Sequence, residues 1–421
     1  MFYKAAVIKI ECNKNLTLHY FRRDENMDSK KLNKTILKYE KDIVAFARDI
    51  IRTPSFSMQE GKLVARIKKE MLKVGFDKVK VDKMGNIIGF IGHGKKKIMM
   101  DAHIDTVGIG DPKAWKIDPF AGILKNGNIY GRGATDQKLS MASMVYAGKA
   151  IKELGLEGDY TLMVVGSVME EDCDGLPLLH IINKEKLRPD FVVITEPTDL
   201  KVYRGHRGRM EMKVVTKGRS CHASAPERGD NAVVKMADIT KEITALNKRL
   251  KVDKFIGKGT VAVTCIECKT PSYNAVPDEC TIYLDRRLTI GETLKSSVTE
   301  IKRLPSVKKA GAKVEVLYYN ETAWTGLKVG QEKYFPTWVL PENHKLVQAG
   351  VKAGVDALGK KPVVDRWVFS TNGVASAGRL GIPTIGFGPS NEVYAHTVNE
   401  FMPVSDLLKA AVFYAALPQY L

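Results

Sequence analysis

Five short segments of this 421-residue chain each end an apolar run with side chains that bind metal ions well. They span residues 99–105, 131–138, 164–172, 192–198 and 394–400. Together they supply imidazoles and carboxylates, namely His103, Asp105, Asp136, Glu170, Glu171, Glu196 and His396. This mixture suits two divalent ions, with zinc the first expectation and cobalt or manganese also acceptable. The set predicts a metal-dependent hydrolase.

The residues before these polar side chains are typical of buried parallel strands. Residues 97–100, 161–169 and 191–195 are short runs rich in β-branched side chains or Met. In an open α/β sheet, ligands gather outside the carboxyl ends of the strands. A single carboxylate pair is usually a solvated surface feature, because isolated motifs have many false matches. Five such segments in order favour a functional site instead.

The order of these segments, with GRSCHASAPERGDNA at residues 218–232 between the fourth and the fifth, points to a known family. It resembles the two-zinc amidohydrolases and exopeptidases (M20-type metallopeptidases) that include acetylornithine deacetylase, succinyl-diaminopimelate desuccinylase and glutamate carboxypeptidase. The resemblance runs from about Lys34 to the C-terminus. Residues 369–400 look most like the YgeY-like, deacetylase-like hydrolases associated with selenium-dependent purine catabolism.

The resemblance implies a role for each metal-binding side chain. Asp136 is expected to bridge two divalent ions. His103 and Glu196 are expected to bind one of these ions, and Glu171 and His396 the other. Imidazole and carboxylate ligands leave the identity of the metal open among zinc, cobalt and manganese.

The resemblance also implies three catalytic residues. Glu170 is expected to take a proton from a metal-bridged water and to deliver it to the leaving amine. Asp105, two residues beyond His103, is expected to orient that imidazole. His222 is expected to donate to the developing oxyanion, typically across a dimer.

Four residues are expected to bind the substrate. Arg287 matches a family position, and its guanidinium can make two parallel bonds to a carboxylate, which favours an acidic or amino-acid-like substrate. Arg286 points to the other side of the same strand. Asn274 matches a second family position. Asn372 and Gly388 lie in the C-terminal motif, where Asn372 replaces a more common Asp and leaves the substrate assignment open.

The fold class expected from the resemblance is α/β, with a zinc-exopeptidase-like catalytic domain built on a mixed, mostly parallel sheet. From about Arg207 the pattern changes to strand, helix, two strands, helix and strand, which is the ferredoxin-like order. These segments are residues 209–218, 231–250, 259–268, 279–288, 292–304 and 312–319. The sequence therefore predicts an inserted dimerisation (lid) domain at 207–320. The catalytic domain is expected at 31–206 and 321–421, after an N-terminal extension at 1–30.

The N-terminal part of the catalytic domain is expected to be helical. Residues 33–52 carry apolar side chains at helical spacing, and the Pro54 that follows should end that helix. Residues 61–74 repeat the pattern, with Gly75 as the C-terminal cap. Residues 1–26 are expected to be poorly ordered or to add a strand, and Met27 is a possible alternative start.

Composition narrows the class of protein. The chain has 66 Lys and Arg against 48 Asp and Glu, a formal charge of +18, but the basic residues are spread out and no nucleic-acid-binding motif appears. A solvated basic surface that attracts anionic substrates is favoured over nucleic-acid binding. No apolar run is long enough to span a bilayer. The six cysteines are irregularly placed and no secretory signal precedes them, which predicts a cytoplasmic protein with reduced thiols.

We therefore expect a cytoplasmic, homodimeric, two-metal hydrolase that cleaves the amide of an N-acyl amino acid or small peptide. A dipeptidase or carboxypeptidase, or an N-carbamoyl-amino-acid hydrolase, would use the same site. A non-catalytic binding protein that retains the fold is the alternative from a different class. The intact Glu170 and the unbroken ligand set argue against that last alternative.

Overall fold

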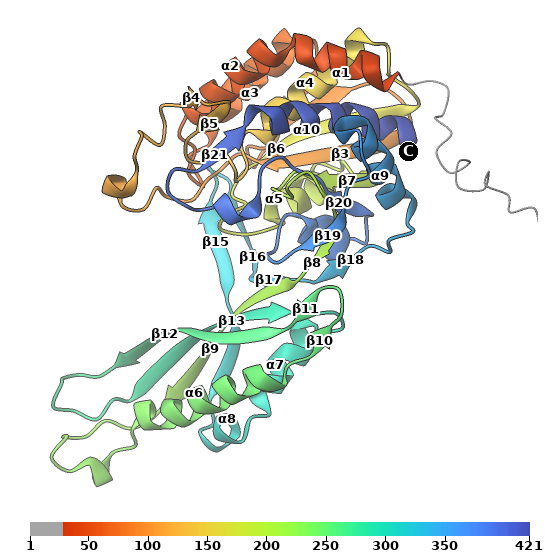
Figure 1. Cartoon of the computed structure of the whole chain (residues 1–421). Coiled ribbons are helices and arrows are strands. Elements are labelled where there is room, and N and C mark those ends of the chain that lie inside the picture. Colours follow the sequence, from red (N-terminus) through yellow and green to blue (C-terminus); the bar gives the residue numbers. More distant parts are fainter. Residues whose placement is uncertain (1–27) are drawn as a thin grey trace, which may run out of the picture.

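The computed structural model describes residues 28–421, which form a large layered unit and a smaller one that projects from it (Figure 1). Nearly all of the expected N-terminal extension, residues 1–30, lies outside the described residues; its last residues begin helix α1. No helix between residues 28 and 421 is long and apolar enough to cross a membrane.

A nine-stranded mixed sheet forms the centre of the large unit. Its strands run in the order β1-β2-β6-β3-β7-β20-β8-β18, and β19 also pairs with β8. The pairings of β3 with β6 and β7, of β7 with β20 and of β8 with β19 are parallel, and the others are antiparallel. The strands are β1 (Lys78–Val81), β2 (Ile87–Ile91), β3 (Lys96–His103), β6 (Tyr160–Ser167), β7 (Phe191–Ile194), β8 (Val202–His206), β18 (Trp338–Val339), β19 (Val364–Trp367) and β20 (Thr384–Gly386).

Helical segments cover both faces of this sheet. Alternate strand residues point to opposite sides, so each face contributes to its own hydrophobic cluster. Ile98 and Met100 join one hydrophobic cluster, whereas Met99 between them joins another. The first cluster includes residues of α1 (Ser29–Lys38), α2 (Glu40–Ile51), α3 (Gly61–Lys73), α4 (Ser140–Glu153), α9 (Lys345–Leu358) and α10 (Val404–Ala416). The second includes residues of α5 (Leu176–Leu179) and of the π-helical segments η3 (His180–Lys184) and η5 (Val374–Arg379).

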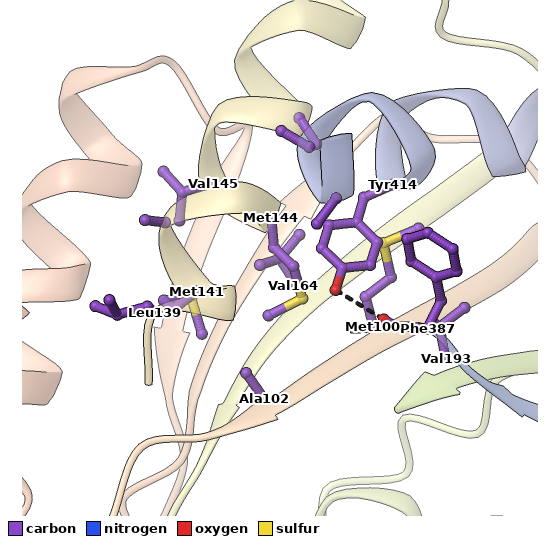
Figure 2. Close-up of a cluster of buried hydrophobic side chains, with 14 of the residues drawn as sticks. Met100, Ala102, Leu139, Met141, Met144, Val145, Val164, Val193, Phe387 and Tyr414 are labelled. Atoms are coloured by element: carbon purple, nitrogen blue, oxygen red, sulfur yellow. Dashed lines mark hydrogen bonds between the residues drawn. The ribbon is translucent and has the colours of Figure 1, made fainter. Parts of the chain in front are cut away.

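Figure 2 shows part of the first cluster, where α4 and α10 pack on the sheet. Met100 and Val164 lie opposite each other on β3 and β6, with Val164 beneath Met144 of α4 and Met100 beneath Tyr414 of α10. Tyr414 of α10 donates a hydrogen bond of 2.8 Å from its hydroxyl to the backbone oxygen of Phe387. This bond helps to satisfy the buried hydroxyl, which also interacts with the side chains of Ser140 and Thr195.

The N-terminal helices differ from the prediction in one respect. Residues 33–52 were predicted as a single helix, which is wrong, because α1 ends at Lys38 and α2 begins at Glu40. Tyr39 lies at the break; its side chain is buried against Tyr146, with ring centroids 5.8 Å apart, and its hydroxyl donates to Glu153. Tertiary packing of this one side chain thus interrupts a continuous helical pattern. The second predicted helix, residues 61–74, agrees with α3, which ends at Lys73, and Gly75 follows it in a left-handed conformation (φ +89°) as predicted.

The smaller unit has the ferredoxin-like order that the sequence predicts. Its antiparallel sheet runs β12-β13-β9-β14, and its helices cover one face around a separate hydrophobic cluster. The elements are β9 (Gly208–Lys217), α6 (Ala232–Arg249), β12 (Thr260–Lys269), β13 (Glu279–Leu288), α7 (Leu294–Lys302), α8 (Pro305–Lys309) and β14 (Lys313–Val316). The last predicted strand, 312–319, is divided, because Tyr318 and Tyr319 belong to a hairpin of β15 (Tyr318–Thr322) and β16 (Lys328–Glu332).

Shorter elements complete the chain. β17 (Tyr334–Phe335) pairs with β9, and a three-stranded sheet runs in the order β21-β5-β4. These and the remaining elements are β4 (Ile123–Lys125), β5 (Asn128–Tyr130), β10 (Val252–Asp253), β11 (Gly257–Lys258), β21 (Phe401–Pro403), and the 3-10 turns η2 (Pro112–Ala114), η4 (Pro226–Arg228), η6 (Glu392–Tyr394) and η7 (Leu417–Tyr420).

Candidate active site

Strand register brings three of the predicted site residues, His103, Glu170 and Glu196, to one edge of the main sheet. His103 ends β3 directly opposite Ser167, the last residue of β6, and Asp101 lies opposite Ile194, the last residue of β7. These pairings are parallel, so all three carboxyl ends meet at the same edge. Glu170 follows β6, and Glu196 follows β7, within a few residues of these ends. The short segments that follow β6 and β7 are therefore enough to bring Glu170 and Glu196 close to His103.

Asp136 lies between the two imidazoles of the cluster. Its Oδ1 is 2.9 Å from His103 Nε2, and its Oδ2 is 3.1 Å from His396 Nε2. His103 Nε2 is also 3.5 Å from a Glu196 oxygen, and His396 Nε2 is 3.0 Å from a Glu171 oxygen. Each oxygen of Asp136 therefore faces a different set of ligands.

The nitrogen and oxygen atoms that could ligate a metal are close enough together to hold cations. One nitrogen or oxygen from each of His103, Asp136 and Glu171 lies within 4.8 Å of the others, and the same holds for His103, Glu170 and Glu196. Among the described residues, Glu170 Oε1 and Glu196 Oε2 are buried without a hydrogen-bond partner. Buried carboxylates need a cation or a donor to be stable. The set therefore fits divalent ions with nitrogen and oxygen ligands.

The electrostatics of the cluster also favour a cation. Hydrogen bonds with Asp136 and Glu171 raise the pKa of His396 to about 10. Burial raises the pKa of Glu170 well above its usual range. A carboxylate in such surroundings is a better proton acceptor than an exposed one.

The orientation of His103 depends on the backbone of Asp105 more than on its carboxylate. His103 Nδ1 is 3.0 Å from the backbone oxygen of Asp105 and 3.6 Å from its Oδ1. The Asp105 carboxylate accepts bonds from the backbone N–H groups of Glu170 and Glu171 and from the Ser57 hydroxyl. The expected orienting role thus changes in detail: Asp105 positions the 170–171 loop as well as the imidazole. With Nδ1 donating to the carbonyl, the lone pair of Nε2 faces Asp136.

Two further carboxylates hold the site loops, and sequence reasoning did not single them out. Glu60 is fully buried and accepts a 3.0 Å bond from the backbone N–H of Met169, which has φ +58° just before Glu170. Burial raises the pKa of Glu60 to about 8. A Glu near a helix start looks in sequence like an ordinary surface residue, so nothing in the sequence marked it.

Glu400 is the second of these carboxylates. It accepts bonds from the backbone N–H groups of Gly133, Thr135 and Asp136 and from the guanidinium of Arg132 at 2.7 Å. These bonds fix the loop that carries Asp136. Glu400 lies within the 394–400 motif, and its position there was the one available signal.

A cavity of about 290 Å³ opens beside the cluster. Two basic residues of the smaller unit, Arg209 and Arg287, line it and lie opposite each other in the β9–β13 register. Arg209 donates to Asp174 at 2.8 Å, and the hydroxyl of Ser370 donates to the other oxygen of that carboxylate. Arg209 and Asp174 thus link the two units across the cavity.

Arg286 and Arg287 point to opposite faces of β13, as strand geometry requires. Arg286 is buried and pairs with Glu292 and Glu300, the latter at 2.8 Å. Arg287 lies in the cavity and donates to Asp285 at 2.8 Å. Arg287 is therefore placed to meet a substrate, and Arg286 is not.

The structure does not bring His222 and Asn274 to the cavity. They lie in neighbouring loops, since His222 forms a β-bridge with Ala275 and the backbone oxygen of Asn274 accepts from Ala223 at 2.8 Å. Both loops are at the end of the smaller unit far from the main sheet (Figure 1). His222 is exposed, and its Nδ1 accepts a 3.1 Å bond from the backbone N–H of Ser224. The neutral imidazole then carries its proton on Nε2, as a donor.

Asn372 and Gly388 occupy structural positions instead of lining the cavity. Asn372 is buried; it donates to Asp101 at 2.9 Å and to Ser167 at 3.0 Å and accepts from the backbone of Gly175 at 2.7 Å. A Cβ on Gly388 would lie 2.1 Å from the backbone oxygen of Glu196. The contacts of these two residues support the strand ends and the Glu196 segment, and the substrate contacts expected of them stay a prediction.

Comparison with known proteins shows the family to which the chain belongs. Residues 99–420 match the model of the peptidase family M20/M25/M40. The chain is 54% identical over 380 residues to the uncharacterized protein YgeY of Escherichia coli (strain K12), covering 90% of this chain and 94% of that one. It is 28% identical to succinyl-diaminopimelate desuccinylase of Gluconacetobacter diazotrophicus, covering 89% and 95%.

A solved structure shares the fold. The Bacillus subtilis YXEP protein, a dinuclear metal-binding peptidase from the M20 family, superposes with a TM-score of 0.66 at 14% identity, covering 90% of this chain and 97% of that one. The chain described here belongs to the M20/M25/M40 peptidase family, as the length of the family match shows.

Proposed function

We propose that this enzyme is a two-metal hydrolase that cleaves the amide bond of a small carboxylate-bearing substrate, either an N-acyl amino acid or a short peptide. The observation that carries the proposal is the position of Asp136, whose two oxygens face His103 and His396 separately. A carboxylate so placed suits a bridge between two ions. The desuccinylase relative and the dinuclear metal-binding YXEP protein support the same chemistry.

The ligands divide into two groups around that bridge. His103 and Glu196 would hold one ion, and Glu171 and His396 would hold the other, with Asp136 shared between them. Zinc is the metal we propose, because imidazole and carboxylate ligands suit it, and cobalt or manganese could replace it. The bound ions supply Lewis acidity toward the amide carbonyl and toward a water molecule.

Glu170 is the proposed general base. It has a buried carboxylate oxygen with no protein partner, and it lines the cavity beside the metal ligands. It takes a proton from the attacking water and returns it to the leaving nitrogen, so that amide and water become a carboxylate and an amine. Arg287 binds a carboxylate of the substrate through its guanidinium.

His222 is the proposed donor to the oxyanion, and it acts in a homodimer. Its Nε2–H is free to donate, but its loop lies at the far end of its own chain from the cavity. Two copies related by a two-fold axis would place each His222 loop at the other copy's cavity. Asn274, in the adjoining loop, would reach the same substrate.

Metal analysis and a substrate panel test the proposal. The purified protein, loaded with zinc, cobalt or manganese, should hydrolyse at least one of matched N-acetyl, N-succinyl and N-carbamoyl amino acids and dipeptides. Glu170→Gln should keep both ions but lose turnover by orders of magnitude, because it removes a proton acceptor and no ligand. Near-normal turnover of this variant would rule out the role of Glu170.

The bridge has a separate test. Asp136→Ala should reduce the metal content at both positions, whereas His396→Ala should chiefly empty one. Metal content is measured per polypeptide by atomic emission after extensive dialysis. Two full equivalents in Asp136→Ala would exclude the bridge.

A further inference from the structure

Two cysteines of the smaller unit, Cys268 and Cys280, lie directly opposite each other on the neighbouring strands β12 and β13. These strands are antiparallel, so the side chains of an opposite pair stand on the same face of the sheet. Opposite residues of antiparallel strands have Cα atoms about 4.5 to 5.5 Å apart, and disulfides span Cα distances of about 4.4 to 6.8 Å. The two thiols can therefore be joined without a change of strand register.

The two thiols differ in their access to solvent. Cys268 is exposed on β12, which is an edge strand of its sheet. Cys280 is fully buried in the hydrophobic cluster of the smaller unit. Burial is the main cause that raises the pKa of Cys280, and the neighbouring Cys268 adds to the effect. An oxidant in solution therefore meets Cys268 first, and Cys280 reacts through its neighbour.

The chain between the two cysteines, residues 269–279, is the loop that carries Asn274. It pairs with the loop of His222, because His222 forms a β-bridge with Ala275. The backbone oxygen of Asn274 also accepts a 2.8 Å bond from that second loop. A covalent bond between the cysteines would close the 269–279 loop at its base and reduce the number of conformations open to it. The same bond would restrain the His222 loop through the bridge.

We propose that Cys268 and Cys280 form a reversible disulfide when the protein meets a small-molecule disulfide such as oxidised glutathione. The Cys268 thiolate attacks one sulfur of that molecule, forms a mixed disulfide and releases one glutathione thiolate. The Cys280 thiolate then attacks the Cys268 sulfur, forms the protein disulfide and releases the second glutathione thiolate. The two protons of the cysteine thiols pass to the two released thiolates. Two protein thiols are thus oxidised and one glutathione disulfide is reduced, independently of amide hydrolysis.

Mass spectrometry of the full chain treated with oxidised glutathione tests the proposal. The intact protein should lose the mass of two hydrogen atoms, its peptide map should join Cys268 to Cys280, and dithiothreitol should reverse both changes. Cys280→Ser should stop at the mixed disulfide and gain one glutathionyl group on Cys268. Cys265→Ser is the matched control, because Cys265 is exposed on the same strand but lies opposite Tyr283, on the other face. This control should form the same bond as the wild type.

Proteolysis of the wild type gives a second readout that needs no variant. Tyr273 is fully exposed in the 269–279 loop and is a site for chymotrypsin. After oxidation, the two fragments produced by cleavage at Tyr273 should stay joined on a denaturing gel without reductant and separate when reductant is added. Separation of these fragments without reductant would overturn the proposal. A glutathione adduct on wild-type Cys268 that never resolves, or a bond from Cys268 to another cysteine, would overturn it as well.

Discussion

His222 offers a sharp test of the proposed dimer, because it lies far from the cavity of its own chain. His222→Ala should change the free energy of unfolding by no more than about 0.5 kcal/mol, since the side chain is exposed. It should reduce kcat by roughly 10²- to 10³-fold, about 2.7 to 4 kcal/mol, the scale measured for one oxyanion donor. A loss of activity without a loss of stability would then reflect the missing donor.

Mixing two inactive variants shows which chain the donor serves. In an equal mixture of His222→Ala and Glu170→Gln that exchanges subunits freely, about half of the dimers combine one chain of each kind. One site of each mixed dimer then receives the intact Glu170 from one chain and the intact His222 from the other. About a quarter of wild-type activity should return under this shared-site arrangement. If His222 served its own chain, every site would still lack one group and no activity would return.

The assay follows hydrolysis of the best substrate over time, with subunit exchange measured by native mass spectrometry of chains of different mass. His93→Ala is the control, since His93 is an exposed histidine in the large unit and should not affect activity. Complete exchange without recovered activity would refute the shared site. Full activity of His222→Ala alone would refute the role of His222 altogether.

Three further predictions concern the support of the site. Gly388→Ala should lower the bound metal and destabilise the fold by about 1 to 3 kcal/mol, because its Cβ would lie 2.1 Å from the backbone oxygen of Glu196; normal metal content and an unchanged unfolding midpoint would contradict this. Asp174→Asn should cost about 1 to 3 kcal/mol in urea unfolding, because the guanidinium of Arg209 loses its 2.8 Å ion pair and keeps only the longer pair with Glu211 at 3.8 Å, and adding Arg209→Met should recover part of that loss; equal stability of the single and double variants would argue against it. Burial lowers the pKa of His206 from 6.5 to about 4, so its contribution to stability is fully present above pH 6.5 and falls by about 3 kcal/mol as the pH falls to 4. His206→Phe should show a shallower loss of stability over that pH range, and identical pH profiles would exclude the effect.

The sequence was informative where a function depends on neighbours along the chain. The segments that carry His103, Glu170 and Glu196 each follow an apolar strand, so their meeting at one sheet edge could be predicted from strand direction alone. The opposite faces of Arg286 and Arg287 followed from strand alternation in the same way.

The sequence failed where a role depends on distant partners. The Asn372 amide meets Asp101, Ser167 and Gly175, more than 190 positions away along the chain, so its structural role was not visible in its own motif. Glu60 likewise acts through Met169. Such contacts depend on tertiary packing, which local patterns do not contain.

The separation of the hydrophobic clusters bears on how the protein unfolds. Met210 and Ile282 belong to the cluster of the smaller unit, which shares no member with the clusters on either face of the main sheet. Because the cores are separate, we expect two cooperative units, so that a single melting temperature would not describe both. We therefore expect heat to unfold the smaller unit, with its His222 loop, before the sheet edge that carries His103. Activity and metal retention would then be lost at different temperatures, which makes thermal inactivation a measure of the weaker unit.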